Sequence, residues 1–273
     1  MSTATNGSGM RGISGPGAHG PQRIAIITGF SLAMNPRPLK EAMTLRSAGH
    51  EVKVFGAALD AARLEVDQSL ARRHGFEFHS VAALGHSGKP DFWRSLVWRA
   101  RGRLAGKMHA LTGMETRFQL GYFGPALLRA AVAWRAGYHI VHLEQGLWVG
   151  AHMLRSGHRV GIDMEDWYSE DLLPEARRHR PVALLRTLES QLLRHAAHRS
   201  CPSRAMSEAL AGGFGCPPPA VVYNTFPWAD RQRLDGRRTD RRTPGRPSLH
   251  WFSQTIGPGR GLEELFQALP AVT

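Results

Sequence analysis

The sequence predicts an α/β fold over residues 23–228, a mostly parallel, Rossmann-like sheet with helices on both faces. Three observations predict it. Short apolar runs alternate with longer amphipathic segments, which is the pattern of repeated strand–helix–strand units. Glycine, proline and asparagine separate these segments, and such residues end strands and delimit helices. The chain has 273 residues, 42% of them hydrophobic, which suffices for the core of one such domain and leaves a remainder.

The first strand and helix have the clearest signals. Residues 24–27 are all apolar and end at Thr28 and Gly29, while Asn35 and Pro36 supply an N-cap and a proline for a first helical turn. Gly49 ends that helix, and a second strand is expected over residues 51–55. Further strands are expected over residues 76–81, 140–143, 160–163, 200–201 and 221–223. Helix-length segments separate these strands, so parallel pairing is expected.

The character of the chain changes after this region. Residues 229–247 hold seven Arg, three Asp, two Gly and two Pro, and we expect a solvated linker there. An apolar run at 249–252, a glycine loop and a helical segment follow. One strand and one helix cannot bury both faces of the strand, so residues 248–273 are expected to be the truncated start of a second Rossmann-like domain. Residues 1–22 contain six glycines and are expected to form a disordered tail.

Composition excludes several classes of protein. No run approaches the ~18–20 consecutive apolar residues of a membrane span, and Cys201 and Cys216 belong to no CxxC pair. A membrane-spanning protein, a disulfide scaffold and a zinc site are therefore not expected. The N-terminal residues lack the features of a signal peptide, so a cytoplasmic location is expected. The 35 Lys+Arg exceed the 22 Asp+Glu by 13, which favours phosphates, anionic lipids or nucleic acid as partners.

Candidate site residues follow the carboxyl ends of the strands, where open parallel sheets bind ligands. In the first loop, Arg37 beside a helix N-terminus could meet an anion, and the alternative is a solvated surface arginine. Glu144 and Gln145 follow the strand at 140–143 and are candidates for acceptor binding. Gly257, Gly259 and Arg260 precede a helical segment and could cradle a diphosphate, although they could also form an ordinary turn.

Three carboxylates follow the strand at 160–163. Asp163, Glu165 and Asp166 could orient sugar hydroxyls, act as a base or hold a divalent ion. The alternative is that Asp163 or Asp166 caps the following helix. The histidines at 139 and 142, three apart on a strand, are expected to be structural.

Residues 89–111, from Lys89 to Leu111, predict a basic amphipathic helix. Its apolar stripe comprises Trp93, Leu96, Val97, Ala100, Leu104, Met108 and Leu111. Six cations oppose the single acid Asp91, and Trp98 lies among the arginines. Such a helix can lie on an anionic membrane surface, at the inner face of the membrane for a cytoplasmic protein. The alternative is a stripe packed on the sheet beneath a solvated basic face.

Six segments, taken in order and spacing, resemble one family. They are NPRPLKEAMTLRSAGHEVKVF after the first strand, IVHLEQG, IDMEDWYSEDLLPE, CPSRAMSEAL, PPPAVVYNTFPW and SLHWFSQTIGPGRGLEELFQAL. Over residues 23–273 the chain resembles retaining nucleotide-sugar glycosyltransferases of the GT-B fold, of the family 4 type. The resemblance implies two Rossmann-like domains facing a cleft. The N-terminal domain would bind the acceptor, and the C-terminal domain would bind the nucleotide diphosphate sugar.

The resemblance also assigns residues. Gly29 matches the glycine loop near the donor, Arg260 matches a diphosphate-binding lysine, and Gln254 stands where an arginine commonly contacts the same phosphates. Glu165 and Asp166 fall at the position of a His-Glu or His-Asp pair beside the transferred sugar, with Glu165 in place of the histidine.

The implied activity is sugar transfer, with retention, to an unidentified glycan, lipid or small-molecule acceptor. The nucleotide sugar would be a co-substrate, and no other cofactor is implied. The family's paired-glutamate motif would lie beyond Thr273, so the chain alone is expected to be an inactive fragment. Two alternatives stay open: a nucleotide-sugar epimerase or hydrolase of the same architecture, and a non-catalytic basic module that binds RNA or anionic lipid. No RNA-binding signature occurs, so nucleic acid is not an expected partner.

Overall fold

A computed structural model describes residues 20–58, 60–83, 89–172, 174–235, 249, 251–252, 256–257 and 259–271. Side chains are described within these ranges except at 82–83, 89–95 and 232–235. Most of the expected tail, the linker from residue 236 onward and Gln254 lie outside the described residues.

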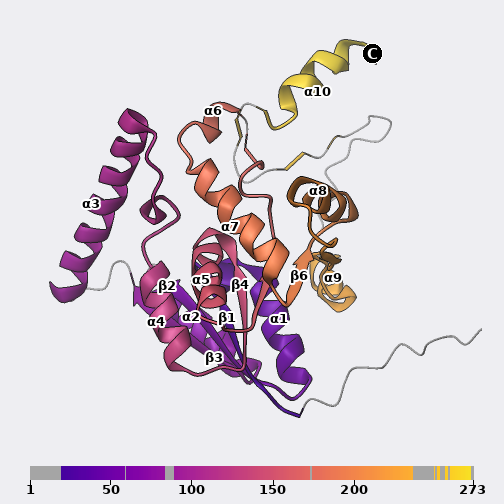
Figure 1. The fold of residues 1–273 in the computed structure, drawn as a ribbon. Coiled ribbons are helices and arrows are strands. Elements are labelled where there is room, and N and C mark those ends of the chain that lie inside the picture. Colours follow the sequence, from indigo (N-terminus) through magenta and orange to yellow (C-terminus); the bar gives the residue numbers. More distant parts are fainter. Residues whose placement is uncertain are drawn as a thin grey trace, which may run out of the picture.

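Seven parallel strands form one sheet in the order β3-β2-β1-β4-β5-β6-β7 (Figure 1). The strands are β1 (Arg23–Ile27), β2 (Glu51–Ala58), β3 (Glu77–Ala83), β4 (Tyr138–His142), β5 (Val160–Asp163), β6 (His198–Cys201) and β7 (Ala220–Val221). The strand order turns back between β1 and β4, which puts a topological switch point at that place. The predicted fold class is confirmed.

Helices cover both faces of the sheet, and two buried apolar clusters lie beneath them. The first cluster lies under α1 (Pro36–Ser47) and α2 (Ala61–Arg73). The second lies under α4 (Gly124–Ala133), α5 (Leu143–Arg155), α7 (Val182–His195) and α8 (Arg204–Phe214). Along β1, Ile24 and Ile26 belong to the first cluster, and Ala25 and Ile27 belong to the second. This alternation is the period-two pattern of a strand that is buried on both sides.

The start of α1 follows from its sequence. The side chain of Asn35 accepts a hydrogen bond from the Arg37 backbone N–H, and Pro36 occupies the first turn, where it removes no helical hydrogen bond. Both signals that predicted this start are confirmed.

The transition from β4 to α5 differs from the prediction. Leu143 is not the last residue of the strand but the first of the helix, and its φ of 62° is left-handed. Glu144 and Gln145 consequently lie in the first turn of α5 and not in a loop. A non-glycine residue in this conformation is strained and marks a constrained, often functional position.

Helix α3 (Lys89–Thr112) does not pack its predicted apolar stripe on the domain; the opposite side of the helix does. Trp98 faces inward, with its ring 5.1 Å from that of Phe123, and Ala105 is buried on the same side. Leu104 and Leu111 from the predicted stripe are exposed. Figure 1 shows α3 standing out at one side of the molecule. The helix is therefore anchored by its minor aromatic side, and its apolar stripe is left outside.

Three short α-helices complete the described fold: α6 (Pro174–Arg177), α9 (Trp228–Asp235) and α10 (Leu262–Ala268). Three single-turn 3-10 helices lie at Leu32–Met34, Arg117–Gln119 and Leu269–Ala271. Helix α9 occupies the start of the expected linker. Its sequence has no apolar stripe, so hydrophobic periodicity did not predict a helix there. Leu249 and Phe252, from the expected strand at 249–252, lie in no strand and are exposed. An isolated strand without a hydrogen-bonded neighbour is not stable, which explains this difference.

Within the described ranges, no helix combines the length and the apolar character that crossing a bilayer requires.

Gly150 permits the close packing of α5 on the sheet. A Cβ added there would lie 2.8 Å from Val141 Cγ2 and 3.0 Å from Leu192 Cδ2, inside the second apolar cluster. We expect G150A to lower the free energy of unfolding by about 1–2 kcal/mol, measured by denaturant titration, because the tight core must shift. G212A in α8 is the matched control, since a Cβ there meets nothing within 4 Å. That variant should gain about 0.5–1 kcal/mol from helix propensity. Equal effects of the two variants would contradict this account of the packing.

Candidate functional site

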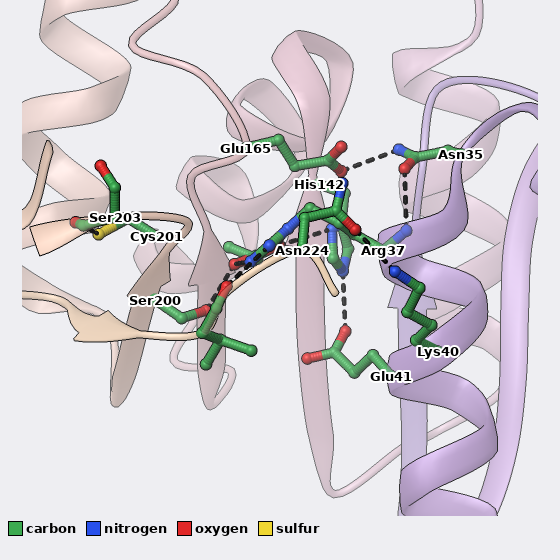
Figure 2. Close-up of polar contacts among 12 residues, drawn as sticks. Asn35, Arg37, Lys40, Glu41, His142, Glu165, Ser200, Cys201, Ser203 and Asn224 are labelled. Atoms are coloured by element: carbon green, nitrogen blue, oxygen red, sulfur yellow. Dashed lines mark hydrogen bonds and ion pairs between the residues drawn. The ribbon is translucent and has the colours of Figure 1, made fainter. Parts of the chain in front are cut away.

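An ion pair between Arg37, which is labelled in Figure 2, and Asp163 lies at the carboxyl edge of the sheet. The guanidinium donates from Nε to Oδ2 and from Nη2 to Oδ1, both at 2.6 Å, and from Nη1 to the Val222 carbonyl at 2.9 Å. Ser200 also donates to Asp163 Oδ1, at 2.7 Å. Burial disfavours both charges, but each partner stabilises the other, so the pKa of Arg37 is raised and the pKa of Asp163 is lowered.

His142 lies beside this pair, at the end of β4, and is 1% exposed. Its Nε2 is 2.8 Å from Glu41 Oε2, and its Nδ1 is 3.0 Å from Glu165 Oε1. Burial alone would lower the pKa of His142, but the charge of Glu41 and the hydrogen bonds to both glutamates raise it to about 10. His142 is therefore an imidazolium at neutral pH that donates from both nitrogens. Asn35 Nδ2 completes the cluster by donating to Glu165 Oε1 at 2.8 Å.

The spacing of this cluster also resembles a metal site. His142, Asp163 and Glu165 offer ligand atoms that all lie within 4.8 Å of one another. Both nitrogens of His142 already face the carboxylates of Glu41 and Glu165, and Arg37 already binds both oxygens of Asp163. The arrangement is that of an ion-pair network, and its chemistry does not fit a resident divalent ion.

A cavity of about 530 Å³ opens at the same edge of the sheet. Its wall includes the aromatic side chains of Phe30, Phe118, Tyr122, Phe123 and Tyr168, and the polar side chains of Gln119, Glu144, Gln145, His179 and Arg180. Its size and mixed lining are those of a small-molecule site.

The strained turn at Leu143 places Glu144 at this cavity, where it pairs with Arg180. Burial raises the pKa of Glu144, although the positive charge of Arg180 acts in the opposite direction. A partly buried ion pair in an open cavity can exchange part of its pairing for hydrogen bonds to a polar ligand.

Gln145 positions the neighbouring loops. Its Oε1 accepts from the Phe123 backbone N–H at 2.9 Å, and its Nε2 donates to the Gly29 carbonyl at 3.3 Å. A Cβ at Gly29 would lie 2.9 Å from that Nε2, so a larger residue would displace the end of the Gln145 side chain. Gly121, with φ of 133°, approaches the Gln145 side chain even more closely. Gln145 thus fixes the shape of the cavity wall through backbone contacts.

Three buried polar atoms at the cavity lack a hydrogen-bond partner in the described part of the chain. They are Tyr168 Oη, Gln119 Nε2 and Arg180 Nε. Tyr168 is 5% exposed. Buried polar groups are usually satisfied, so unsatisfied ones beside a cavity point to a missing polar partner.

The predicted site residues fall into three groups. Gly29, Glu144 and Gln145 line the cavity. Arg37 and Glu165 belong to the buried cluster, and the interpretation of Arg37 as a solvated arginine is wrong, because that residue is 9% exposed.

Neither Asp163 nor Asp166 caps a helix, since the next helix, α6, begins only at Pro174. Asp166 is an exposed residue at the edge of the sheet. Partial desolvation of its carboxylate and the nearby negative charge of Glu165 raise the pKa of Asp166.

The third group lies elsewhere. Gly257, Gly259 and Arg260 precede α10, which Figure 1 shows apart from the sheet, and Arg260 is exposed. These three residues are not among those that line the cavity. Gln254 lies outside the described residues.

The sequence did not propose His142, Glu41, Tyr168 and Arg180 as site residues. His142 was expected to be structural, and in the structure it joins α1 to the loop after β5. Its position at the carboxyl end of a strand, next to Glu144, was a usable signal. Glu41 and Tyr168 had no such sequence signal, because only the fold brings them to the site.

The charge of His142 makes a pH dependence measurable. The pKa of His142 is about 10 in the folded protein, against about 6.5 for an unperturbed histidine. The stabilisation is therefore complete below about pH 6.5 and is lost as pH rises toward about 10. We expect the advantage of the wild type over H142Q in free energy of unfolding to shrink by up to about 1.4 kcal/mol per pH unit in this window. H195Q, at an exposed histidine at the end of α7, is the control. A pH-independent difference between wild type and H142Q would contradict a buried imidazolium.

The fold of this chain is similar to parts of several solved structures. Neither a family model nor a curated protein matches the chain. Sucrose-phosphate synthase from Thermosynechococcus elongatus is 13% identical, with a TM-score of 0.44, over 78% of this chain and 52% of that one. Arabidopsis thaliana UGT89C1, complexed with UDP-L-rhamnose, is 13% identical, with a TM-score of 0.42, over 78% and 51%. A Listeria monocytogenes protein assigned as a UDP-N-acetylglucosamine 2-epimerase is 11% identical, with a TM-score of 0.38, over 73% and 44%. The chain spans about half the length of these three structures, and similarity at this level assigns no function.

Proposed function

We propose that the chain is the acceptor-binding part of a nucleotide-sugar-dependent glycosyltransferase. The observation that carries the proposal is the cavity of about 530 Å³ at the carboxyl edge of the parallel sheet, where aromatic side chains surround the Glu144–Arg180 ion pair. The order of the six family-like segments supports it independently.

The lining of the cavity suits a sugar or another polyhydroxylated acceptor. Aromatic rings such as Phe118 and Tyr122 offer flat apolar surfaces for the C–H face of a sugar ring. The carboxylate of Glu144 accepts hydrogen bonds from hydroxyls, while Arg180 and Tyr168 donate to oxygen atoms. This combination of a few polar groups with apolar walls gives orientation as well as affinity.

In the proposed reaction, an acceptor hydroxyl oxygen forms a bond to the anomeric carbon of the donor. The bond from that carbon to the diphosphate oxygen breaks, and the electron pair leaves with the nucleotide diphosphate. Glu144 holds the attacking hydroxyl, and its raised pKa suits a group that accepts a proton. Glu165 and Asp166 remain proposed to contact the transferred sugar, with Asp166 the freer of the two because Asn35 and His142 hold Glu165.

Further details of the proposal come from the resemblance. They are retention of configuration, the family 4 type, a hexose or related sugar, the nucleotide sugar as sole co-substrate, and diphosphate contacts from Gly257, Gly259, Arg260 and Gln254. Cationic groups near the leaving diphosphate would stabilise its developing charge.

Ligand binding by the full chain tests the proposal. The probes are p-nitrophenyl glycosides of glucose, mannose, galactose and N-acetylglucosamine, titrated by calorimetry or ligand-observed NMR. We expect at least one glycoside to bind, and E144Q to weaken binding about tenfold, because a hydrogen bond to a charged group is lost. E77Q is the matched control, since the carboxylate of Glu77 forms an exposed ion pair with Lys53 outside the cavity.

Y168F separates binding from folding. Removal of the unpartnered hydroxyl should leave the free energy of unfolding unchanged or slightly higher, and binding of the glycoside should weaken. Wild-type affinity in both Y168F and E144Q would contradict the assignment of this cavity. Release of free sugar or an epimer from UDP-N-acetylglucosamine alone would indicate a hydrolase or epimerase instead.

A further inference from the structure

The outward side of α3 presents an exposed apolar surface. Leu96, Val97, Leu104 and Leu111 are 38%, 46%, 60% and 85% exposed, respectively. Their spacing of mostly three to seven residues places them on one side of the helix, together with Ala100. Large apolar side chains gathered on one exposed surface mark an interaction site more often than scattered ones do.

The opposite side of α3 attaches the helix to the domain. Trp98 packs on Phe123, Ala105 is buried, and Gly102 approaches Tyr122 so closely that a Cβ would lie 2.9 Å from its ring. The exposed apolar side is therefore not the side that the domain uses.

Positive charges border this apolar surface on both sides. Between Leu96 and Thr112 the sequence contains Arg99, Arg101, Arg103 and Lys107, but no Asp or Glu. At about 100° per residue, Arg101 lies on one flank of the stripe, Arg99 and Arg103 lie on the other, and Lys107 lies within it. Long basic side chains at such positions can rest their methylene groups on an apolar surface and extend their charges to its rim.

We propose that α3 seats its outward side on the surface of an anionic lipid bilayer. Leu96, Leu104 and Leu111 would enter the boundary between head groups and acyl chains, while the flanking arginines contact lipid phosphates. A polynucleotide would use the cations but leave the leucines exposed to water. A second copy of the chain would place two acid-free basic surfaces against each other, where like charges repel.

The same helix forms part of the cavity wall. Gly102 and Gly106 line the cavity, so a docked α3 brings that cavity next to the lipid surface. If the proposed function holds, the acceptor is then the head group of a membrane-anchored molecule. Membrane docking itself requires no sugar transfer, so its test can fail while the proposed function stands.

Vesicle co-sedimentation with the full chain tests the proposal. We expect binding to phosphatidylcholine vesicles that contain phosphatidylglycerol, weakening as salt increases, and little binding to phosphatidylcholine alone. The double variant L104Q/L111Q should lower the partition coefficient about tenfold or more, because two leucines lose their apolar environment. The double variant R99Q/R103Q should lower the partition coefficient and also reduce its salt dependence.

Matched substitutions on α2 control for the general loss of apolar surface and charge. Val66 is 49% exposed, and Arg72 and Arg73 are exposed on the same helix, so V66Q and R72Q/R73Q should bind vesicles like the wild type. Circular dichroism and thermal unfolding check that all variants fold.

Four results would overturn the proposal. The first is no binding to vesicles that contain phosphatidylglycerol, and the second is wild-type partition of L104Q/L111Q. The third is binding of a single-stranded RNA that depends on Arg99 and Arg103 but not on the leucines, which would assign the surface to nucleic acid. Loss of a dimer in L104Q/L111Q, by analytical ultracentrifugation without vesicles, would assign it to a second copy of the chain and also count against a lipid surface.

Discussion

The bidentate ion pair of Arg37 and Asp163 determines how the carboxyl edge of the sheet is built. Arg37 comes from the first turn of α1 and Asp163 from the end of β5, 126 residues later. Through Val222 and Ser200 the same pair reaches the segment after β7 and the strand β6. Neither charge tolerates burial without the other, so the approach of α1 to the second half of the sheet is coupled to the correct placement of β5. The loops that shape the candidate site depend on this alignment.

The site consists of two parts with different chemistry. The cluster around His142 is internally satisfied, because each of its charges has an opposite partner within hydrogen-bonding distance. The neighbouring cavity is open and retains unsatisfied donors, among them Tyr168 Oη. A fully satisfied network rigidifies its surroundings, while an incompletely satisfied one has hydrogen-bonding capacity left for a ligand. The cluster therefore supports the site, and the free hydrogen-bonding capacity proposed for the acceptor lies in the cavity.

Lys40 extends this support along α1. Its ammonium donates to Asn224 Oδ1 at 2.7 Å and to the Thr225 carbonyl at 2.6 Å, and lies 3.7 Å from the centre of the Phe226 ring. The segment after the last strand is thus fastened to the first helix, at the end of the sheet where Figure 2 shows Lys40 and Asn224 close together.

Local patterns predicted most of the fold, but only part of the site. Strand β5 and the start of α1 were predictable because an apolar run and a capping pair act over a few residues. The burial of Arg37 was not, since its partner is distant in sequence. The orientation of α3 stayed open in the sequence, because helical periodicity identifies a stripe but does not say which side packs on the domain. In the cavity, Glu144 and Gln145 were predictable from their place after a strand, whereas Tyr168 reaches the wall through a turn that has no sequence signal.

The absence of a loop between β4 and α5 also limits how the cavity can change during evolution. Leu143 turns the chain within a single residue, so Glu144 is fixed to the sheet and has little freedom to follow a ligand of different size. The facing wall is different, because Gly106 of α3 has open space where a side chain would project. Related proteins with the same core could therefore acquire new ligand preferences through substitutions on α3, while the residues at the start of α5 stay constant.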